Sequence, residues 1–384
     1  MTPAEAHQKP VEYSTREQRS WYMYDFANSA FASTVLTLFL GPYLTSLANA
    51  AADPTGRVDV FGVRMDARAY WGYLVSLAVF LQVLVLPLIG AVADLSPRKK
   101  QLLGLCAYTG AVATMAMFFL SGRMFLLGGL LFLIANLAFG ASIVVYNSFL
   151  PEIAAPEDRD RVSSRGWGIG YLGGGILLAL NLVLFSRAKS FGLTEGMAVR
   201  ISLASAGVWW ALFSVVSLAG LRNRQPLVRA GAGESIVSKG FGQLMATLRE
   251  VRNYPETLKF LIAFLLYNDA IQAVIALSAQ FGSVELKIPM GSLTMAILMV
   301  QFVAFVGAML FQYLAAAIGA KRSVILSLLI WSGVIVAIYV SVRGVQGFFI
   351  MAFVVGLVLG GSQALSRSLF SLMIPKGREG EYFS

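Results

Sequence analysis

Apolar residues occur along the chain in runs of about 20 residues, and short polar segments separate them. A helix of this length matches the hydrocarbon thickness of a bilayer. The pattern therefore predicts ten membrane-spanning helices. They cover Trp21–Leu47, Tyr70–Ile89, Gln101–Leu120, Met124–Leu150, Val162–Phe185, Val199–Leu221, Pro255–Phe281, Leu293–Ala317, Ser323–Val342 and Val345–Ile374.

The polar segments divide these helices into two groups. Residues 1–20 form a predicted cytoplasmic tail, 21–221 a six-helix bundle, 222–254 a central cytoplasmic loop and 255–384 a second bundle with helices 7–10. Within the central loop, Ile236–Val251 is predicted to form an amphipathic helix on the inner leaflet. The polar end of the chain, Pro375–Ser384, is expected to be cytoplasmic. The fold class is an all-α polytopic membrane protein.

Composition supports a membrane protein and explains the excess of positive charge. Hydrophobic residues make up 57% of the chain and charged residues 13%, whereas soluble domains carry about 25% charged residues. The net charge is +10, and most Lys and Arg fall in the tail and the even-numbered loops. This asymmetry predicts a cytoplasmic N-terminus. We therefore expect a multi-pass protein of the cell (inner) membrane, in contact with lipid and not with nucleic acid.

The sequence offers no residues for an enzyme site, a metal or a cofactor. His7, the only histidine, lies in the tail, and Cys106, the only cysteine, lies in an apolar run. An intramolecular disulfide is therefore impossible. Without an intramembrane histidine or a set of metal ligands, hydrolytic or redox chemistry has nothing to build from. We expect no metal, no cofactor and no catalytic residue, and a protein that works as a monomer.

The segment Gly90–Lys100, here called the gating loop, joins the second and third predicted helices. Asp94 ends one helix, and Arg98, Lys99 and Lys100 begin the next. Each charge lies at the end of the helix dipole that disfavours it, so contacts between helices are a better explanation than dipole stabilisation. The alternative is a positively charged anchoring loop without a moving part.

The gating loop resembles the motif Gly-x-x-x-Asp-x-x-Gly-Arg-x-Lys/Arg of the major facilitator superfamily. Gly90, Asp94, Arg98 and Lys100 match it, and Pro97 stands where the family usually has Gly. The resemblance implies an alternating-access transporter in which this loop stabilises one conformation.

The second half of the chain repeats features of the first. Gln312–Arg322 repeats the gating loop with Ala316 in place of the acid, Gly360–Ser362 repeats Gly140–Ser142, and Tyr267–Ala273 repeats Tyr24–Ala30. Such a repeat is typical of transporters, and together with the resemblance above it implies a major facilitator fold with a six-helix N-terminal bundle. The C-terminal bundle is then an incomplete four-helix one. We expect a chain truncated before its last two helices, with a ten-helix variant as the alternative.

Polar residues within the spans are candidates for function because they are costly there. Asp269 is expected near the middle of helix 7, where a buried carboxylate can carry a proton; the alternative is a structural hydrogen bond. Asp25 occupies the equivalent place in helix 1, nearer the aqueous boundary, which favours a helix-end or ion-pair role over transport. Arg367 either binds a carboxylate or extends to the nearby membrane face.

Further candidates for substrate or proton binding lie in helices 1, 4, 5, 7 and 8, and the transport site is expected at the midplane between helices 1, 4, 7 and 10. Those in helix 4 either face a central cavity or join helices by hydrogen bonds. The further candidates are Asn28, Asn136, Tyr146, Asn147, Tyr171, Tyr267, Asn268, Gln272 and Gln301.

Five segments together resemble the narrower unknown-major-facilitator family, whose members include an autophagy-related vacuolar amino-acid effluxer. They are Tyr24–Phe31, Tyr146–Ile153, Ser164–Gly173, Tyr267–Asp269 and Gln363–Ser368. The resemblance implies a twelve-helix facilitator in which Arg367 ends the tenth helix, and export of neutral amino acids. We therefore predict a secondary transporter of a small solute, coupled to protons. The alternative is a receptor-like or scaffolding protein that has the fold and moves no solute.

Overall fold

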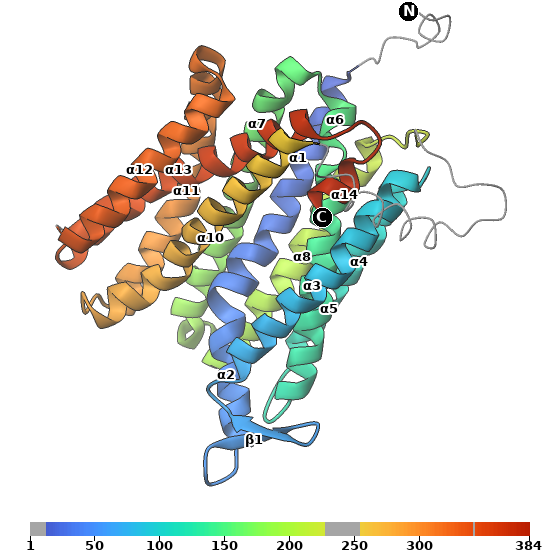
Figure 1. Ribbon diagram of the computed structural model, residues 1–384. Helices are drawn as coiled ribbons and strands as arrows, with labels where there is room; N and C mark the ends of the chain where they lie inside the picture. The colour runs from blue at the N-terminus through green and yellow to red at the C-terminus, as the bar shows by residue number, and fades with distance from the viewer. Residues whose placement is uncertain (1–12, 227–253, 341) are drawn as a thin grey trace, which may run out of the picture.

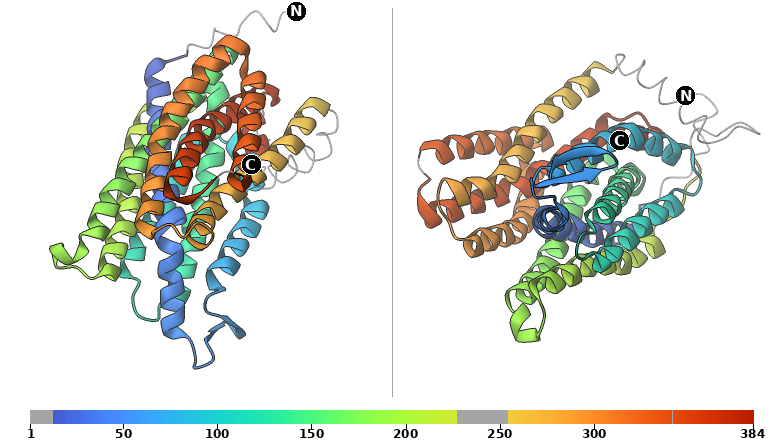
Figure 2. Two further views of the ribbon diagram at one scale, coloured as in Figure 1. Left: turned by 90° about the vertical axis from the view of Figure 1, so that its left-hand side faces the viewer. Right: turned by 90° about the horizontal axis from the view of Figure 1, so that it is seen from below.

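The computed structural model describes residues 13–226, 254–340 and 342–384, and helices dominate it (Figure 1). Ten helical spans in these ranges are long and apolar enough to cross a membrane, so the predicted fold class is confirmed. We call α1–α8 the N-terminal half and α10–α13 the C-terminal half; Figure 2 shows them side by side. The helices are α1 (Thr15–Ala30), η2 (Phe31–Phe39), α2 (Leu40–Ala51), α3 (Tyr70–Leu95), α4 (Lys99–Ala116), η3 (Met117–Phe119), α5 (Phe125–Asn147), α6 (Leu150–Ile153), η4 (Pro156–Asp158), α7 (Arg159–Ser186), η5 (Ala188–Phe191), α8 (Glu195–Gly220), α10 (Pro255–Val284), α11 (Met290–Ile318), α12 (Ala320–Val340), α13 (Gly344–Met373) and α14 (Glu379–Phe383).

Local sequence signals set several helix boundaries. The Thr194 hydroxyl accepts a hydrogen bond from the Met197 amide (3.2 Å), which caps the start of α8 as an N-cap threonine does. Pro255 is the first residue of α10, where its missing N–H leaves no helical bond unmade. Gly319 separates α11 from α12 with φ +89°, a conformation that favours glycine.

The first membrane span contains a π-helical segment, η2, between α1 and α2. Short π-helical insertions in α-helices frequently mark functional sites. The Ser33 hydroxyl lies within hydrogen-bond distance of the Ser29 carbonyl (2.9 Å) and of the Gly174 carbonyl of α7 (3.2 Å). The irregular segment is therefore joined to α7.

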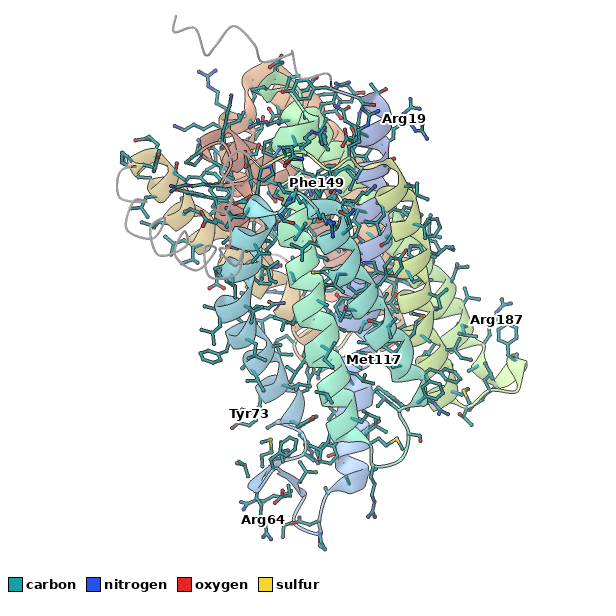
Figure 3. The ribbon with its side chains drawn as sticks, turned by 90° about the vertical axis from the view of Figure 1, so that its right-hand side faces the viewer. Arg19, Arg64, Tyr73, Met117, Phe149 and Arg187 are labelled. Atoms are coloured by element: carbon teal, nitrogen blue, oxygen red, sulfur yellow. The ribbon has the colours of Figure 1, made fainter. Side chains whose placement is uncertain are left out.

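A β-hairpin extends from one end of the molecule. Strands β1 (Arg57–Val60) and β2 (Val63–Asp66) pair antiparallel, and Phe61 and Gly62 form the turn with φ 51° and 89°. Positive φ at both turn residues matches the right-handed twist of a hairpin. Figure 3 shows Arg64 at this end, called the hairpin face, and Arg19 and Phe149 at the opposite end, called the N-terminal face.

The structure differs from the sequence-based boundaries at both ends of the chain. The predicted tail 1–20 ends early, because α1 begins at Thr15 and the side chains of Glu17 and Gln18 are buried. The polar segment Pro375–Ser384 contains α14, which packs against α3 of the N-terminal half. The polar loop expected between helices 1 and 2 contains the hairpin. The amphipathic helix predicted over Ile236–Val251 lies outside the described residues.

Helix α7 makes the main contact between the two halves, since it packs against α1 on one side and against α11 and α13 on the other. Its glycines allow both approaches. A Cβ atom at Gly173 would lie 2.5 Å from the Phe26 carbonyl of α1, and one at Gly168 would lie 2.7 Å from the Met309 side chain of α11.

Candidate functional site

Arg367 of α13 crosses from the C-terminal half into a buried site formed by α1, α5 and α7. Its Nη1 lies 3.3 Å from Oδ2 of Asp25, and both side chains are more than nine-tenths buried. The Tyr146 hydroxyl donates to the same Asp25 oxygen at 2.7 Å. A buried ion pair is stable only when further hydrogen bonds complete it, and Tyr146 supplies one to the carboxylate.

The remaining hydrogen-bond donors of Arg367 also find partners. Nε donates to the Ser163 hydroxyl at 2.9 Å and Nη2 to the Ser163 carbonyl at 2.8 Å, while Nη1 lies 3.4 Å from Oδ1 of Asn147. The planar guanidinium also lies over aromatic rings, 4.7 Å from the ring centre of Trp21 and 5.4 Å from that of Trp167. Such a desolvated cation–π contact contributes about 2 kcal/mol. We call Trp21, Asp25, Tyr146, Ser163, Trp167 and Arg367 the arginine cluster.

The arginine cluster depends on a glycine in α7. A Cβ atom at Gly166 would lie 2.8 Å from Asp25 Oδ2 and 3.0 Å from Arg367 Nη2. A side chain at this position would occupy the space in which the two charges meet. Gly166 therefore allows α7 to pack closely against the ion pair.

Three more hydrogen bonds join α7 to α13 toward the N-terminal face. Ser163 Oγ donates to the Ala364 carbonyl (2.7 Å), Ser368 Oγ to Asp160 Oδ1 (2.5 Å) and Arg159 Nη1 to the Ser371 carbonyl (2.6 Å). None of these residues was a site candidate from the sequence, although Ala364 and Ser368 fall in the segment Gln363–Ser368 that carries the family resemblance. The sequence signal for them is that polar residues lie on one face of an otherwise apolar helix, in both α7 and α13. Such a polar face is equally compatible with an interhelical contact and with a solvated surface.

The structure places other predicted candidates at helix contacts. Tyr267 and Asn268 of α10 bond to α13, through Ser366 (2.6 Å) and Gln363 (3.1 Å). Asn28 and Asn136 are buried in the N-terminal half. Two further candidates lie where α7 meets the C-terminal half. Tyr171 of α7 packs against the hydrophobic core of the C-terminal half, and Gln301 of α11 lies beside Gly175 of α7.

Asp269 differs from its expected environment. Its side chain and that of Gln272 are exposed, so the burial on which the proton-carrier role of Asp269 rested is absent in this conformation. The physical reason is helical geometry, since consecutive residues point about 100° apart. Asn268 bonds to Gln363 of α13, whereas the side chain of the next residue, Asp269, lies on another face of the helix and is exposed.

The gating loop contacts the C-terminal segment. The buried carboxylate of Asp94 accepts hydrogen bonds from the amides of Gly380 (2.7 Å) and Glu381 (3.0 Å). Gly90 and Gly380 pack backbone against backbone, with no space for a side chain at either. This conformation therefore ties α3 of the N-terminal half to the segment that follows α13.

Of the three gating-loop cations, Lys99 is the buried one. Its ammonium lies 2.6 Å from Glu152, whereas Arg98 is exposed and Lys100 is partly exposed, with its backbone amide donating to Asn223 (2.9 Å). The motif match had pointed to Arg98 and Lys100. Lys99 is the first residue of α4, and its buried side chain pairs with Glu152 of α6.

Arg224 extends this charge network to the start of α1. It donates to both carboxylate oxygens of Glu17 (2.9 and 2.8 Å) and lies 3.5 Å from Glu152. Burial alone would lower the pKa of Arg224, but hydrogen bonding to Glu17 and the charge of Glu17 hold this pKa above its ordinary value. The segment after α8 is thereby fixed to α1. Among the described residues no group of histidine, cysteine and acidic side chains could hold a metal ion.

A family model described as "Vacuole effluxer Atg22 like" matches residues 13–384. The MFS-type transporter YxiO of Bacillus subtilis is 27% identical over 371 residues, which cover 96% of this chain and 83% of YxiO. Autophagy-related protein 22 of Yarrowia lipolytica is 26% identical, over 86% of this chain and 70% of that protein.

Solved structures of similar fold are also transporters. The human organic anion transporter MFSD10 superposes with a TM-score of 0.68 at 13% identity, over 98% of this chain and 89% of that one. A bacterial homologue of the iron transporter ferroportin in an outward-facing state gives 0.64 at 15% identity, over 96% and 86%. At these identities the likeness concerns the fold alone.

Proposed function

The chain belongs to the Atg22-like vacuole effluxer family and is a transporter of the major facilitator superfamily, and we propose that it exports neutral amino acids by alternating access. The observation that carries this proposal is the buried ion pair between Asp25 and Arg367. It joins the two halves of the molecule and offers the two charges that complement a zwitterion.

The chemistry of the pair suits an amino acid in its zwitterionic form. A guanidinium binds a carboxylate through two parallel hydrogen bonds, and a carboxylate binds an ammonium group. In this conformation Asp25 and Arg367 satisfy each other, and a solute that carries both charges competes for both. The aromatic rings around Arg367 supply apolar surface for a neutral side chain.

The position of the pair supports alternating access. Asp25 lies ten residues into α1, about 15 Å from its start, and Arg367 lies near the end of α13. Both are therefore closer to the N-terminal face than to the hairpin face, and the pair must break before the N-terminal face opens. The contact of Asp94 with α14 stabilises the same closed arrangement.

Proton coupling fits Asp25 better than Asp269. Protonation of Asp25 removes the negative charge that holds Arg367, whereas Asp269 is exposed and holds no cation among the described residues. We propose that a proton on Asp25 weakens the contact between the halves. By its positive charge the N-terminal face is assigned to the cytoplasm, with the protein acting as a monomer in the cell membrane.

The test is uptake of radiolabelled neutral amino acids into liposomes that contain the purified protein, with and without a pH gradient. Asp25→Asn is compared with Glu157→Gln, which changes an exposed acid near the N-terminal face. We expect proton-driven uptake by the wild type and by Glu157→Gln, and its loss in Asp25→Asn. Uptake by Asp25→Asn at the wild-type rate and with the wild-type pH dependence would contradict the proposal.

A further inference from the structure

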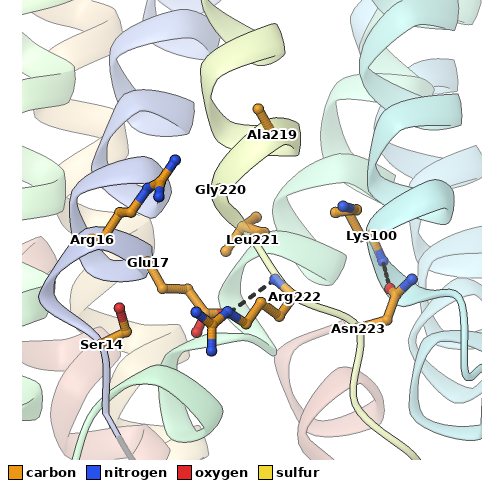
Figure 4. Close-up of a pocket in the computed structure, with 9 residues that line it drawn as sticks. All are labelled: Ser14, Arg16, Glu17, Lys100, Ala219, Gly220, Leu221, Arg222 and Asn223. Carbon is orange, nitrogen blue, oxygen red and sulfur yellow. Dashed lines mark hydrogen bonds between the residues drawn. The ribbon is translucent and has the colours of Figure 1, made fainter.

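A cavity of about 410 Å³ opens at the N-terminal face, between the start of α1, the start of α4 and the end of α8. Figure 4 shows its lining, in which Arg16, Lys100 and Arg222 come from three separate segments. Glu17 is the acidic residue among the lining side chains, and Ser14 and Asn223 add polar groups. The cavity lies apart from the arginine cluster and is not used by the proposed transport mechanism.

Within the described ranges, the three cations of this cavity have no acidic ion-pair partner. The carboxylate of Glu17 is buried and already accepts hydrogen bonds from the Arg222 amide (3.0 Å) and from the guanidinium of Arg224 (2.9 and 2.8 Å). No acidic side chain within the described ranges forms an ion pair with Arg16, Lys100 or Arg222. Three cations around one cavity without an acidic partner favour a ligand with negative charge.

Helices α4 and α8, which border the cavity, also carry exposed apolar side chains. On α4, Leu105 is 67% and Val112 58% exposed; on α8, Leu212 is 61% and Val215 52% exposed. Leu105 and Val112 are seven residues apart, which places them on one face of α4. These residues lie within membrane spans, so their exposed side chains meet lipid tails. The cavity therefore lies where the charged headgroup of a lipid ends and its acyl chains begin.

We propose that this cavity binds the phosphate of an anionic phospholipid headgroup, with the acyl chains lying along α4 and α8. Lys and Arg in pockets between membrane helices bind such headgroups. A bound lipid bridges Arg16 of α1, Lys100 of α4 and Arg222 after α8, and so stabilises the N-terminal half at the face where the gating loop lies.

The test measures binding of short-chain phosphatidylglycerol to the full chain in neutral detergent, by the rise in thermal unfolding temperature during titration. The double variant Lys100→Gln/Arg222→Gln removes two cavity cations. Arg19→Gln/Lys376→Gln is the matched control, because it removes two exposed cations outside the cavity. Each cation near a lipid surface contributes about a factor of five to the affinity for an anionic lipid. We therefore expect roughly 30-fold weaker binding of phosphatidylglycerol in the cavity variant, which lacks two cations. The control is expected to stay within about twofold of the wild type.

Phosphatidylcholine and inorganic phosphate serve as the second arm of the experiment. We expect phosphatidylcholine to bind weakly because it lacks net charge, and inorganic phosphate to give no rise because it lacks acyl chains. Equal losses in the cavity variant and the control would show a general surface-charge effect and overturn the proposal. Inorganic phosphate binding as tightly as phosphatidylglycerol would assign the cavity to a free anion and overturn the lipid assignment.

Discussion

Asp25 and Arg367 are 342 residues apart in the sequence, and their side chains meet 3.3 Å apart in a buried site between the two halves of the transporter. Because both charges are buried, the desolvation cost of each is offset by its attraction to the other. Removing one partner of a buried pair is typically destabilising by 3–5 kcal/mol, since it leaves the other charge uncompensated. The pair is therefore suited to hold one conformation strongly and to release it when a proton or a charged solute intervenes.

Arg367→Lys is expected to impair the protein although it keeps the positive charge. Lysine cannot reproduce the planar fork that bonds Asp25 and Ser163 together, and it stacks less well on Trp21. We expect a loss of about 1–3 kcal/mol in stability together with reduced transport. Thermal unfolding of the purified protein measures the first, with Arg19→Lys, an exposed arginine, as control. Equal stability of Arg367→Lys and the wild type would show that charge alone matters.

Asp94→Asn is expected to loosen the C-terminal segment from α3. A neutral amide is a weaker acceptor for the amides of Gly380 and Glu381 than a carboxylate, so α14 opens more often. Hydrogen exchange of the peptide 375–384 measures this opening, and we expect it to be faster by about tenfold, as a loss of about 1.4 kcal/mol implies. The control is Glu157→Gln, which removes the negative charge of an exposed side chain. Unchanged exchange in Asp94→Asn would show that backbone packing against Gly90 holds the segment.

Gly173→Ala and Gly72→Ala are expected to have opposite effects. At Gly173 the new methyl group meets Phe26 of α1, and such overpacking typically costs about 1–3 kcal/mol. A Cβ atom at Gly72 of α3 would have no atom within 4 Å apart from its own helix backbone and chain neighbours, so alanine is expected to stabilise the helix by up to about 1 kcal/mol. Thermal unfolding compares the two variants directly. A neutral Gly173→Ala would mean that α7 can move away from α1 at little cost.

Asp269→Asn is expected to leave proton-driven transport within about twofold of the wild type. The Asp269 side chain is exposed, whereas its neighbour Asn268 bonds to Gln363. Initial uptake rates across a pH series test this expectation. Loss of the pH dependence in Asp269→Asn would return the proton-carrier role to helix α10.

The hydrophobic pattern predicted the helices well because a membrane span is a local property of about 20 residues. It placed each of the ten membrane spans, with boundaries shifted by a few residues. The hairpin was missed because its turn, Phe61-Gly62, is not one of the favoured pairs such as Asn-Gly. The helical start at Thr15 was missed because Thr15–Ser20 is polar, and its burial comes from contacts with distant segments.

The site was only partly predictable from the sequence, because the identity of the polar residues does not show toward which neighbouring helix each side chain points. Asp25, Tyr146, Asn147 and Arg367 were all candidates, and the structure brings them together. Nothing in the sequence pairs Asp25 with Arg367 across so many residues. Nor does spacing show that Asp269 is exposed while Asn268 bonds to Gln363 of α13.

The most direct test of the account measures the distance between the two halves at the N-terminal face. Spin labels at Glu157→Cys and Lys321→Cys, both exposed, report it by double electron–electron resonance in a Cys106→Ser background. We expect a narrow distance distribution in the otherwise unchanged protein, and a shift to longer distances when Asp25→Asn and Arg367→Gln are combined. An unchanged distribution in that double variant would contradict the claim that this ion pair holds the N-terminal face closed.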